Sequence, residues 1–353
     1  MKKKDITIYD IAQQLSLSSS TVSRALQDHP SIKKQTKQKV VIKAKELGYR
    51  YNHFAGSLRK PQTNTIGFLV HELNSSFITS VLSGIEKITT AAGYNLLIAH
   101  SSESFKKEIA NAENFFNQRV DGLIASLTFD TENLNHFKPF NDKGIPLVFF
   151  DRVEENNDHN TSVIIDNYKC GYQATQHLIE QGCKRIVIAT SSLKRNVYRE
   201  RHRGYKDALH DNGLPYSEKL VIINDISEKA AIENANRILK MNQLPDGIFI
   251  THDFSAAVCM QVLNDHGIHV PADIAIVGFN NDDISKLVQP RLTTINYPGK
   301  DLGEIAARNL IDQLNNKTTL QIANRIIIRS DLIIRQSSLK KKLQMQKIFL
   351  ISG

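Results

Sequence analysis

The chain has 353 residues, a net charge of +9 and three cysteines. This length predicts two or three domains. No apolar run approaches the roughly 18 residues of a membrane span, and no apolar core of a secretory signal follows Met1, so we expect a cytoplasmic protein without a membrane partner. The cysteines are far apart and form no CxxC pair, which argues against a disulfide framework and against a cysteine-based zinc site.

The excess of positive charge lies in the first sixth of the chain. Residues 1–60 hold 13 Lys and Arg against 4 Asp and Glu, a net +9, and the remainder is balanced. A small basic segment joined to a neutral body is typical of a polyanion-binding module attached to a second domain. A solvated basic surface is the alternative interpretation of the charge alone.

Three short helices are predicted in this basic segment. Apolar residues at 8, 11, 12 and 15 follow one face of a helix, for which Thr7 is a suitable N-cap. After a turn over 16–18, Ser18 caps a second helix over 19–26. Ser31 is expected to cap a third helix, with residues 40, 41, 44 and 47 facing inward and Gly48 after its end. Two short helices joined by a tight turn, then a longer one, form a helix-turn-helix arrangement.

In this arrangement the second helix enters the major groove of DNA with its N-terminus first. Ser19, Ser20 and Arg24 would then face the bases, because an arginine fork matches O6 and N7 of guanine. Thr21, Ser23 and the lysines of the third helix suit phosphates, which position a protein on DNA without specifying a sequence. Three helices that serve only as a small packed domain are the alternative.

The residues TIYDIAQQLSLSSSTVSRAL, followed by KELGY, resemble the headpiece of the LacI/GalR family of bacterial transcription regulators. The order of elements resembles the family as far as Ser337. By this resemblance, Ala55 and Leu58 belong to a hinge helix that packs against its partner, with Leu58 wedged into the minor groove. Tyr51, where the family usually has proline, and Gly56 depart from the pattern, and a plain linker is the alternative. The DNA-contacting residues that the resemblance implies are Thr7, Tyr9, Ser18, Ser19, Ser20, Thr21, Ser23, Arg24, Asn52, Ala55 and Leu58.

The remainder of the chain alternates short apolar runs with helical stretches. Ten strands are expected, at 66–70, 94–99, 122–125, 146–150, 162–165, 185–189, 220–223, 247–250, 274–277 and 293–295. Helical patterns lie between them at 78–91, 168–180, 203–210, 230–241 and 255–265. This alternation predicts parallel sheets with helices on both faces. The resemblance implies a two-lobed α/β domain of the periplasmic-binding-protein-like type (type I), with three crossovers and a ligand cleft between the lobes.

Polar and aromatic side chains follow the predicted strands, where open α/β sheets bind ligands. Amides, carboxylates, arginines and aromatic rings are the groups that a sugar pocket needs. Asn280 and Tyr297 replace the family's usual Asp and Gln, and His252-Asp253 replaces Asn-Asp, so the pocket is more cationic and a sugar acid or phosphate is also considered. Arg201 competes with Arg199 as the lining arginine. The effector-binding residues that the resemblance implies are Asn74, Ser76, Phe77, Asp151, Arg152, Arg199, Arg201, His252, Asp253, Asn280 and Tyr297.

Other classes of function are less consistent with the sequence. A metal role for His252 lacks a second ligand at suitable spacing, and no cofactor is predicted. No phosphate loop, GxGxxG or GxSxG motif supports a two-lobed enzyme. A free sugar-binding protein leaves the basic headpiece unexplained.

We therefore expect four segments: a small all-α helix-turn-helix headpiece (1–50), a hinge helix and linker (51–65), a two-lobed effector-binding and dimerisation domain with parallel sheets (66–337) and a disordered tail (338–353). The predicted function is that of a homodimeric regulator, a repressor of carbohydrate-metabolism genes. It binds a pseudo-palindromic double-stranded DNA operator and responds to a small sugar or sugar derivative.

Overall fold

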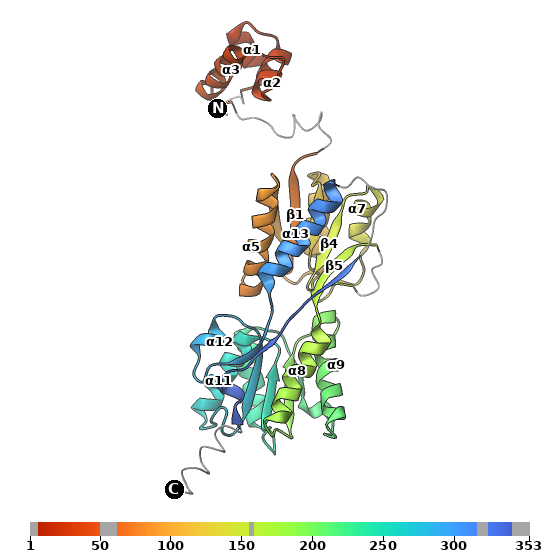
Figure 1. Ribbon diagram of the computed structural model, residues 1–353, viewed down its shortest axis with the longest axis vertical. Helices are drawn as coiled ribbons and strands as arrows, with labels where there is room; N and C mark the ends of the chain where they lie inside the picture. Colours follow the sequence, from red (N-terminus) through yellow and green to blue (C-terminus); the bar gives the residue numbers. More distant parts are fainter. Residues whose placement is uncertain (1–5, 50–61, 155–158, 316–323, 341–353) are drawn as a thin grey trace. The chain divides into compact units, whose positions relative to one another are not determined.

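The computed structural model describes residues 6–49, 62–154, 159–315 and 324–340. The chain divides into two compact units, Met1–Thr63 and Asn64–Gly353, which we call the headpiece and the body (Figure 1). No helix in the described ranges is both long enough and apolar enough to cross a membrane.

The headpiece contains the three predicted helices, α1 (Ile8–Leu15), α2 (Ser19–Leu26) and α3 (Lys34–Glu46). Their core is formed by Ile11, Val22 and Val40, which are fully buried, together with three alanines. The buried positions of each helix lie on one side of it, so each helix turns one apolar face toward the other two. The helix-turn-helix arrangement is confirmed.

Two details of the third helix differ from the prediction. Ser31 does not cap it, because its hydroxyl lies 2.8 Å from Nδ1 of His29 and the helix begins only at Lys34. Val41 was expected to face inward, but its side chain is 52% exposed. The buried positions of α3 are 40 and 44, one turn apart, and Val41 lies 100° around the helix from Val40.

The body has two lobes, each built on a six-stranded sheet. The first sheet is parallel throughout, with the order β11-β5-β4-β3-β1-β2. The second has the order β12-β10-β9-β8-β6-β7 and is parallel except for the pairing of β12 with β10. The strands are β1 (Thr65–Val70), β2 (Asn95–His100), β3 (Gly122–Ala125), β4 (Leu147–Phe150), β5 (Thr161–Ile165), β6 (Ile186–Thr190), β7 (Val221–Ile223), β8 (Gly247–Ile250), β9 (Ala275–Asn280), β10 (Thr293–Asn296), β11 (Arg325–Ile328) and β12 (Leu332–Ile333).

The ten predicted strands are all present, with ends that differ by up to three residues. Central strands such as β3, β4 and β8 are buried along their whole length. Because helices cover both faces of a parallel sheet, such strands consist of continuous apolar residues, and this made them visible in the sequence. The strands β11 and β12 were not predicted. Both lie at sheet edges, and their burial patterns contain no fully buried residue.

Helices α5, α6, α7 and α13 belong to the first lobe, and α8 to α12 belong to the second (Figure 1). The helix predicted at 203–210 begins earlier, at Asn196. The bounds are α5 (Ser76–Ala91), α6 (Phe105–Asn117), α7 (Lys138–Asp142), α8 (Asn167–Glu180), α9 (Asn196–Asp211), α10 (Glu228–Leu239), α11 (Asp253–Asp265), α12 (Ile284–Leu287) and α13 (Gly299–Asn315). Short 3-10 helices cover Asn135–Phe137, Glu218–Leu220 and Gln336–Ser338.

The chain passes between the lobes at three places, as the family resemblance implied. It crosses from β5 to α8, returns from β10 to α13, and crosses again from β11 to β12. The carboxyl ends of β5 and β10 therefore lead straight into the space between the lobes, which is where parallel sheets bind ligands.

The C-terminal boundary of the body lies beyond the predicted one. Ser338 is fully buried, and its hydroxyl lies 2.7 Å from Nε2 of His177. Lys340 donates from its ammonium group to the backbone carbonyls of Asp246 and Asp273. Residues 338–340 thus pack on the second lobe rather than beginning a disordered tail. The rest of the predicted tail, and the hinge residues Asn52, Ala55 and Leu58, lie outside the described residues.

Candidate DNA-reading face and interlobe pocket

Hydrogen bonds fix the N-termini of the first two headpiece helices. The backbone N–H of Thr7 donates to Oδ2 of Asp10 at 2.7 Å, three residues into α1. The hydroxyl of Ser18 accepts the backbone N–H of Thr21 at 3.1 Å and lies 2.8 Å from the hydroxyls of Ser20 and Thr21. Serine and threonine are favoured at such positions because they satisfy the free N–H groups of a helix start.

The predicted base-contacting side chains lie on the open side of α2. Ser20 and Arg24 are both exposed and stand four residues apart, which places them on one helical face. Val22 and Ala25 are buried on the opposite face. Ser19, Thr21 and Ser23 are half-buried between these faces, and Tyr9 on α1 is 69% exposed. The side chains of Ser20 and Arg24 are therefore on the surface that can meet a groove, although the hydroxyl of Ser20 also bonds that of Ser18.

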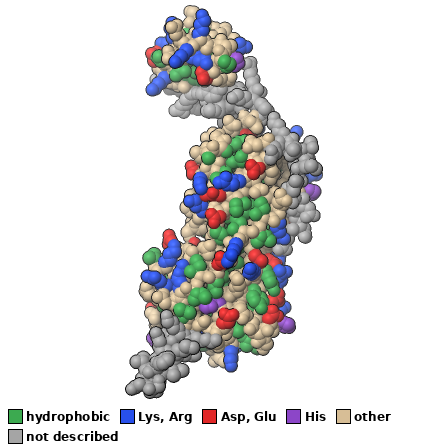
Figure 2. Space-filling model, in the orientation of Figure 1, with side chains coloured by type: hydrophobic (Ala, Val, Ile, Leu, Met, Phe, Trp, Pro, Cys, Tyr) green, Lys and Arg blue, Asp and Glu red, His purple; other side chains and the backbone are tan. Residues whose placement is uncertain are grey.

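Lys and Arg side chains are visible on the surface of the headpiece (Figure 2). One of the lysines expected at phosphates is already engaged. The ammonium group of Lys37 bonds the backbone carbonyl of Asp28 at 2.9 Å and its carboxylate at 2.7 Å. Lys34 and Lys39 on the same helix are exposed and are better placed for a phosphate backbone.

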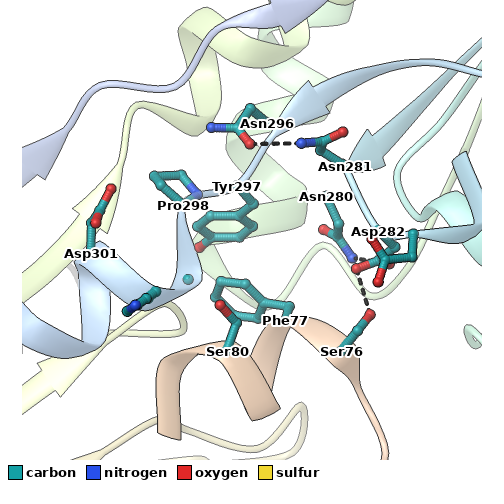
Figure 3. Close-up of a pocket in the computed structure, with 13 residues that line it drawn as sticks. Ser76, Phe77, Ser80, Asn280, Asn281, Asp282, Asn296, Tyr297, Pro298 and Asp301 are labelled. Carbon is teal, nitrogen blue, oxygen red and sulfur yellow. Dashed lines mark hydrogen bonds between the residues drawn. The ribbon is translucent and has the colours of Figure 1, made fainter. Parts of the chain in front are cut away.

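A cavity of about 400 Å³ lies between the two lobes of the body (Figure 3). We call it the interlobe pocket. Its wall combines the start of α5, the loop after β9 and the crossover from β10 to α13. The lining residues are Ser76, Phe77, Ser80, Asn280, Asn281, Asp282, Asp283, Asn296, Tyr297, Pro298, Gly299, Lys300 and Asp301.

Two aromatic rings form the apolar part of this wall. The rings of Phe77 and Tyr297 are stacked, with centroids 4.1 Å apart and planes 27° from parallel. Tyr297 also meets Phe279 edge-on, with centroids 5.9 Å apart. Beside the rings, the hydroxyl of Ser76 in the first lobe donates to Oδ1 of Asp282 in the second lobe at 2.6 Å. The pocket therefore offers ring surface together with amide, hydroxyl and carboxylate groups.

A second group of predicted residues, Asp151, Arg152 and Arg201, makes up what we call the inner charged cluster. The hydroxyl of Tyr297 donates to Oδ1 of Asp151 at 2.6 Å, which links this cluster to the wall of the interlobe pocket. All three side chains are at least 95% buried. Charges so deeply buried require partners.

Both arginines of the cluster have such partners. Arg152 donates to Oε1 of Glu103 at 2.7 Å, and its guanidinium lies 3.9 Å from the ring centroid of Phe129. Arg201 donates from Nε to Oδ1 of Asn167 at 2.9 Å and lies 3.5 Å from the ring centroid of Phe279. Arg201, rather than Arg199, is thus the arginine that lies among the aromatic residues of the cleft.

Burial also shifts the protonation equilibria of these groups. Burial raises the pKa of Asp151, while Arg152 and the hydrogen bond from Tyr297 oppose this shift. Burial likewise raises the pKa of Tyr297 well above its usual value, so its hydroxyl remains a donor. The pKa of Asp253 rises to about 7, because the carboxyl group is removed from water.

Seven of the eleven predicted effector residues do not line the interlobe pocket, and four of these seven do not belong to the inner charged cluster either. Asn74 is exposed, and Arg199 is directed to the carbonyl of Lys194 and the carboxylate of Glu200. His252 lies with Nδ1 3.2 Å from the hydroxyl of Ser255. Asp253 is fully buried, where it accepts the backbone N–H of Asp282 at 2.8 Å and the hydroxyl of Thr294 at 2.7 Å. Its role in the structure is to hold the loop after β9.

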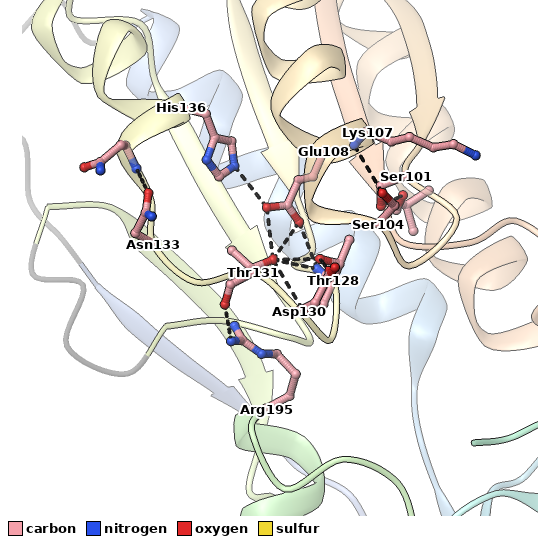
Figure 4. Close-up of polar contacts among 12 residues, drawn as sticks. Ser101, Ser104, Lys107, Glu108, Thr128, Asp130, Thr131, Asn133, His136 and Arg195 are labelled. Carbon is pink, nitrogen blue, oxygen red and sulfur yellow. Dashed lines mark hydrogen bonds and ion pairs between the residues drawn. The ribbon is translucent and has the colours of Figure 1, made fainter. Parts of the chain in front are cut away.

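The sequence did not single out two residues that join the lobes on another side, namely Arg195, which is shown in Figure 4, and Asn196. Arg195 donates to the carbonyl of Thr131 at 2.7 Å, and Thr131 is in turn held by the buried carboxylate of Glu108. Asn196 accepts the N–H of Val153 and donates to the carbonyl of Asp151, both at 3.0 Å. Both residues precede or begin α9, which starts seven residues before the predicted position.

Nine residues of the interlobe pocket were not predicted: Ser80, Asn281, Asp282, Asp283, Asn296, Pro298, Gly299, Lys300 and Asp301. For Asn281, Asp282, Asp283 and Asn296 the signal was present, because the first three follow β9 directly and Asn296 ends β10. Among the described residues, no group of three or more His, Cys, Asp or Glu is arranged to hold a metal ion.

Comparisons with known proteins agree with this architecture. Residues 7–52 match the family described as bacterial regulatory proteins, lacI family, and residues 175–338 match the periplasmic binding protein-like domain. The catabolite control protein A of Priestia megaterium is 32% identical over 330 residues, which cover 92% of this chain and 98% of that protein.

Two solved structures show the same arrangement. The complex of the transcriptional regulator CelR with cellobiose is 26% identical, with a TM-score of 0.71, and the match covers 94% of this chain and 99% of that one. The Lac repressor dimer bound to operator and the anti-inducer ONPF shares the fold with a TM-score of 0.82 at 23% identity, over 95% of this chain and 100% of the other. The chain belongs to the LacI family of bacterial transcription regulators, and its headpiece is the DNA-binding domain of that family.

Proposed function

We propose that this regulator is a repressor of carbohydrate-metabolism genes, and that a small uncharged sugar bound in the interlobe pocket controls it. The observation that carries the proposal is the wall of that pocket. Both lobes contribute to it, and it pairs a stacked ring surface with amide and carboxylate groups. A protein that acts on operators works where the DNA is, so we place it in the cytoplasm.

The chemistry of the pocket favours a sugar. The faces of sugar rings pack on aromatic side chains, while adjacent hydroxyls bond to amides and carboxylates. Three carboxylates, those of Asp282, Asp283 and Asp301, lie in the wall with one lysine. The two arginines that suggested an anionic ligand are buried and paired elsewhere. Uncharged sugars are therefore favoured over sugar acids and phosphates.

The proposed regulator acts as a homodimer on a pseudo-palindromic operator. The Lac repressor, with the same fold, was solved as a dimer on its operator. In this chain hydrophobic side chains are visible on the surface of the body (Figure 2), and Ile98, Phe254 and Leu287 are more than 40% exposed. Apolar side chains so exposed are suited to an interface between two subunits. Two headpieces could then meet two half-sites related by the same symmetry.

The ligand can regulate only through a difference between two arrangements of the lobes. The pocket wall suits this requirement, because Ser76 and Asp282 come from different lobes and Tyr297 lies in the crossover between them. A sugar that contacts these groups binds the closed arrangement better than an open one. Coupling of this kind between sites is typically worth about 1–3 kcal/mol.

Two measurements test the proposal. Selection of bound sequences from random DNA should return a pseudo-palindrome. In an electrophoretic mobility-shift assay, the full chain should bind this DNA as a dimer. A panel of uncharged sugars that includes cellobiose, with sugar acids and phosphates for comparison, should contain a ligand that raises the thermal midpoint and changes operator affinity.

The proposal of an uncharged effector is contradicted if only anionic ligands raise the thermal midpoint. Phe77→Ala is the matched variant, because it removes one of the two stacked rings and leaves the headpiece unchanged. It should weaken sugar binding while operator affinity without sugar stays within the range of the unmodified protein.

A further inference from the structure

Tyr297 separates the interlobe pocket from the inner charged cluster. Its ring stacks on Phe77, and its edge faces Phe279. The Arg201 guanidinium carbon lies 5.6 Å from the centroid of the same ring. Tyr297 thus lines the interlobe pocket (Figure 3) and also lies near an arginine that is 3% exposed and does not belong to the pocket wall.

Two contacts hold this ring in place. The hydroxyl is tied to Asp151 at 2.6 Å, and the backbone N–H of Tyr297 donates to the carbonyl of Asn280. The ring is only 6% exposed. A side chain anchored at both its backbone and its tip is a fixed wall rather than a mobile flap.

The cluster behind the wall is complete without a ligand. Arg152 is bonded to Glu103, and Arg201 is bonded to Asn167 and to the carbonyl of Thr251. Asp151 receives the tyrosine hydroxyl. The pocket in front carries the opposite charge, because its wall contains three carboxylates and one lysine.

We propose that Tyr297 is the specificity residue of the cleft: by separating Arg201 from the pocket, it leaves only the carboxylate-lined pocket to the effector and so selects an uncharged sugar over an anionic one. The inference rests on the proposed function, which places the effector in this cleft. It assigns the choice of ligand charge to one side chain. Removing the ring should open Arg201 to solvent and to anions.

Labelling of arginines by phenylglyoxal in the full-length protein tests this directly. Tyr297→Ala should raise the labelling rate of Arg201, measured by mass spectrometry of peptides, several-fold over the unmodified protein. Tyr297→Phe keeps the ring and should leave Arg201 protected. Arg203, whose side chain is 58% exposed on the same helix, supplies the internal rate standard.

A second buried arginine distinguishes opening from unfolding. Arg195 is 6% exposed and bonds the first lobe at Thr131 rather than Tyr297. It should stay protected in Tyr297→Ala if only the wall is removed. The inference is overturned if Arg201 reacts as readily in the unmodified protein as in the alanine variant, or if it stays unreactive in that variant.

The charge selection is tested with galacturonate and galactose, which differ by one carboxylate. In Tyr297→Ala, galacturonate should slow the labelling of Arg201 at concentrations about tenfold lower than galactose, because a charge-assisted pair forms with the guanidinium. Equal effects of the two sugars, or none, refute selection by charge. If no uncharged sugar binds the unmodified protein, the proposed function is refuted instead. The two failures can be told apart, because the labelling rate of Arg201 without ligand does not depend on sugar binding.

Discussion

Substitution of Gly171 by alanine should damage the second lobe and displace an arginine of the cleft at the same time. Gly171 lies on α8 where that helix crosses α9. A Cβ atom at this position would stand 2.1 Å from the backbone oxygen of Arg201 and 2.7 Å from its Cα. An ordinary contact is at least 3.4 Å, so the helices would have to separate by about 1.3 Å.

The free energy cost follows from this distance. Forcing an extra methyl group into a packed site costs about 1–3 kcal/mol, and here the obstacle is backbone, which yields least. The higher helix propensity of alanine relative to glycine offsets about 1 kcal/mol of this cost. We expect the free energy of unfolding to fall by about 2 kcal/mol. Because the displaced atoms belong to Arg201, its 2.9 Å bond to Asn167 should be lost as well.

Urea unfolding followed by circular dichroism measures the change in free energy, and phenylglyoxal labelling of Arg201 reports its displacement. Gly144→Ala is the matched control. No atom lies within 4 Å of the added Cβ there, and φ is +65°, so only the left-handed backbone conformation costs about 1 kcal/mol. If Gly171→Ala is as stable as the control and Arg201 stays protected, the close contact of α8 and α9 at Gly171 neither excludes a methyl group nor positions Arg201.

Three further predictions concern the headpiece, the lobes and pH. Arg24→Ala should reduce discrimination between operators by about 1–3 kcal/mol, whereas Lys34→Ala should weaken binding to all sequences alike, as measured by fluorescence anisotropy over a range of salt; equal loss of discrimination would contradict this. Arg195→Ala removes the bond to Thr131 and should speed amide exchange in residues 128–136, which unchanged exchange would disprove. The pKa of Asp253 is raised from 3.8 to about 7 by burial. The folded state therefore holds this proton more tightly than the unfolded state, and its contribution to stability is lost as pH rises from about 4 to 7, by up to about 4 kcal/mol. In Asp253→Asn this fall should be smaller in urea titrations at each pH, and an identical pH profile would show that Asp253 stays ionised.

The headpiece could be predicted in detail because its determinants are local. Helix faces repeat every three or four residues, and caps act within three residues of a helix start. Ser18 illustrates this, since its hydroxyl bonds the N–H three residues later. Val41 and Ser31 were misplaced because a propensity pattern does not define the rotation of α3 or its first turn to within one residue.

The sheets could be predicted where strands are buried on both faces. Strands at the edges lack that signal. The strands β11 and β12 also depend on partners that lie more than 150 and nearly 40 residues away along the chain, respectively. Arg195 and Asn196 were missed for a related reason. Their acceptors, Thr131 and Asp151, lie in the other lobe, so nothing local distinguishes them from surface residues at a helix start.

The candidate site could be predicted only in part. The sequence predicts polar residues at the strand ends, but it does not show which of them form hydrogen bonds with one another. In the described part of the chain, four hydrogen bonds between residues of different lobes are Ser76 to Asp282, Arg195 to Thr131, and the two bonds of Asn196. At about 1 kcal/mol each, they stabilise closure by a few kcal/mol before any ligand binds. That sum is comparable to the coupling energy expected of a regulator. An effector therefore needs only a modest preference for one arrangement of the lobes to control the headpiece, and the charge and shape around Tyr297 decide which molecules have that preference.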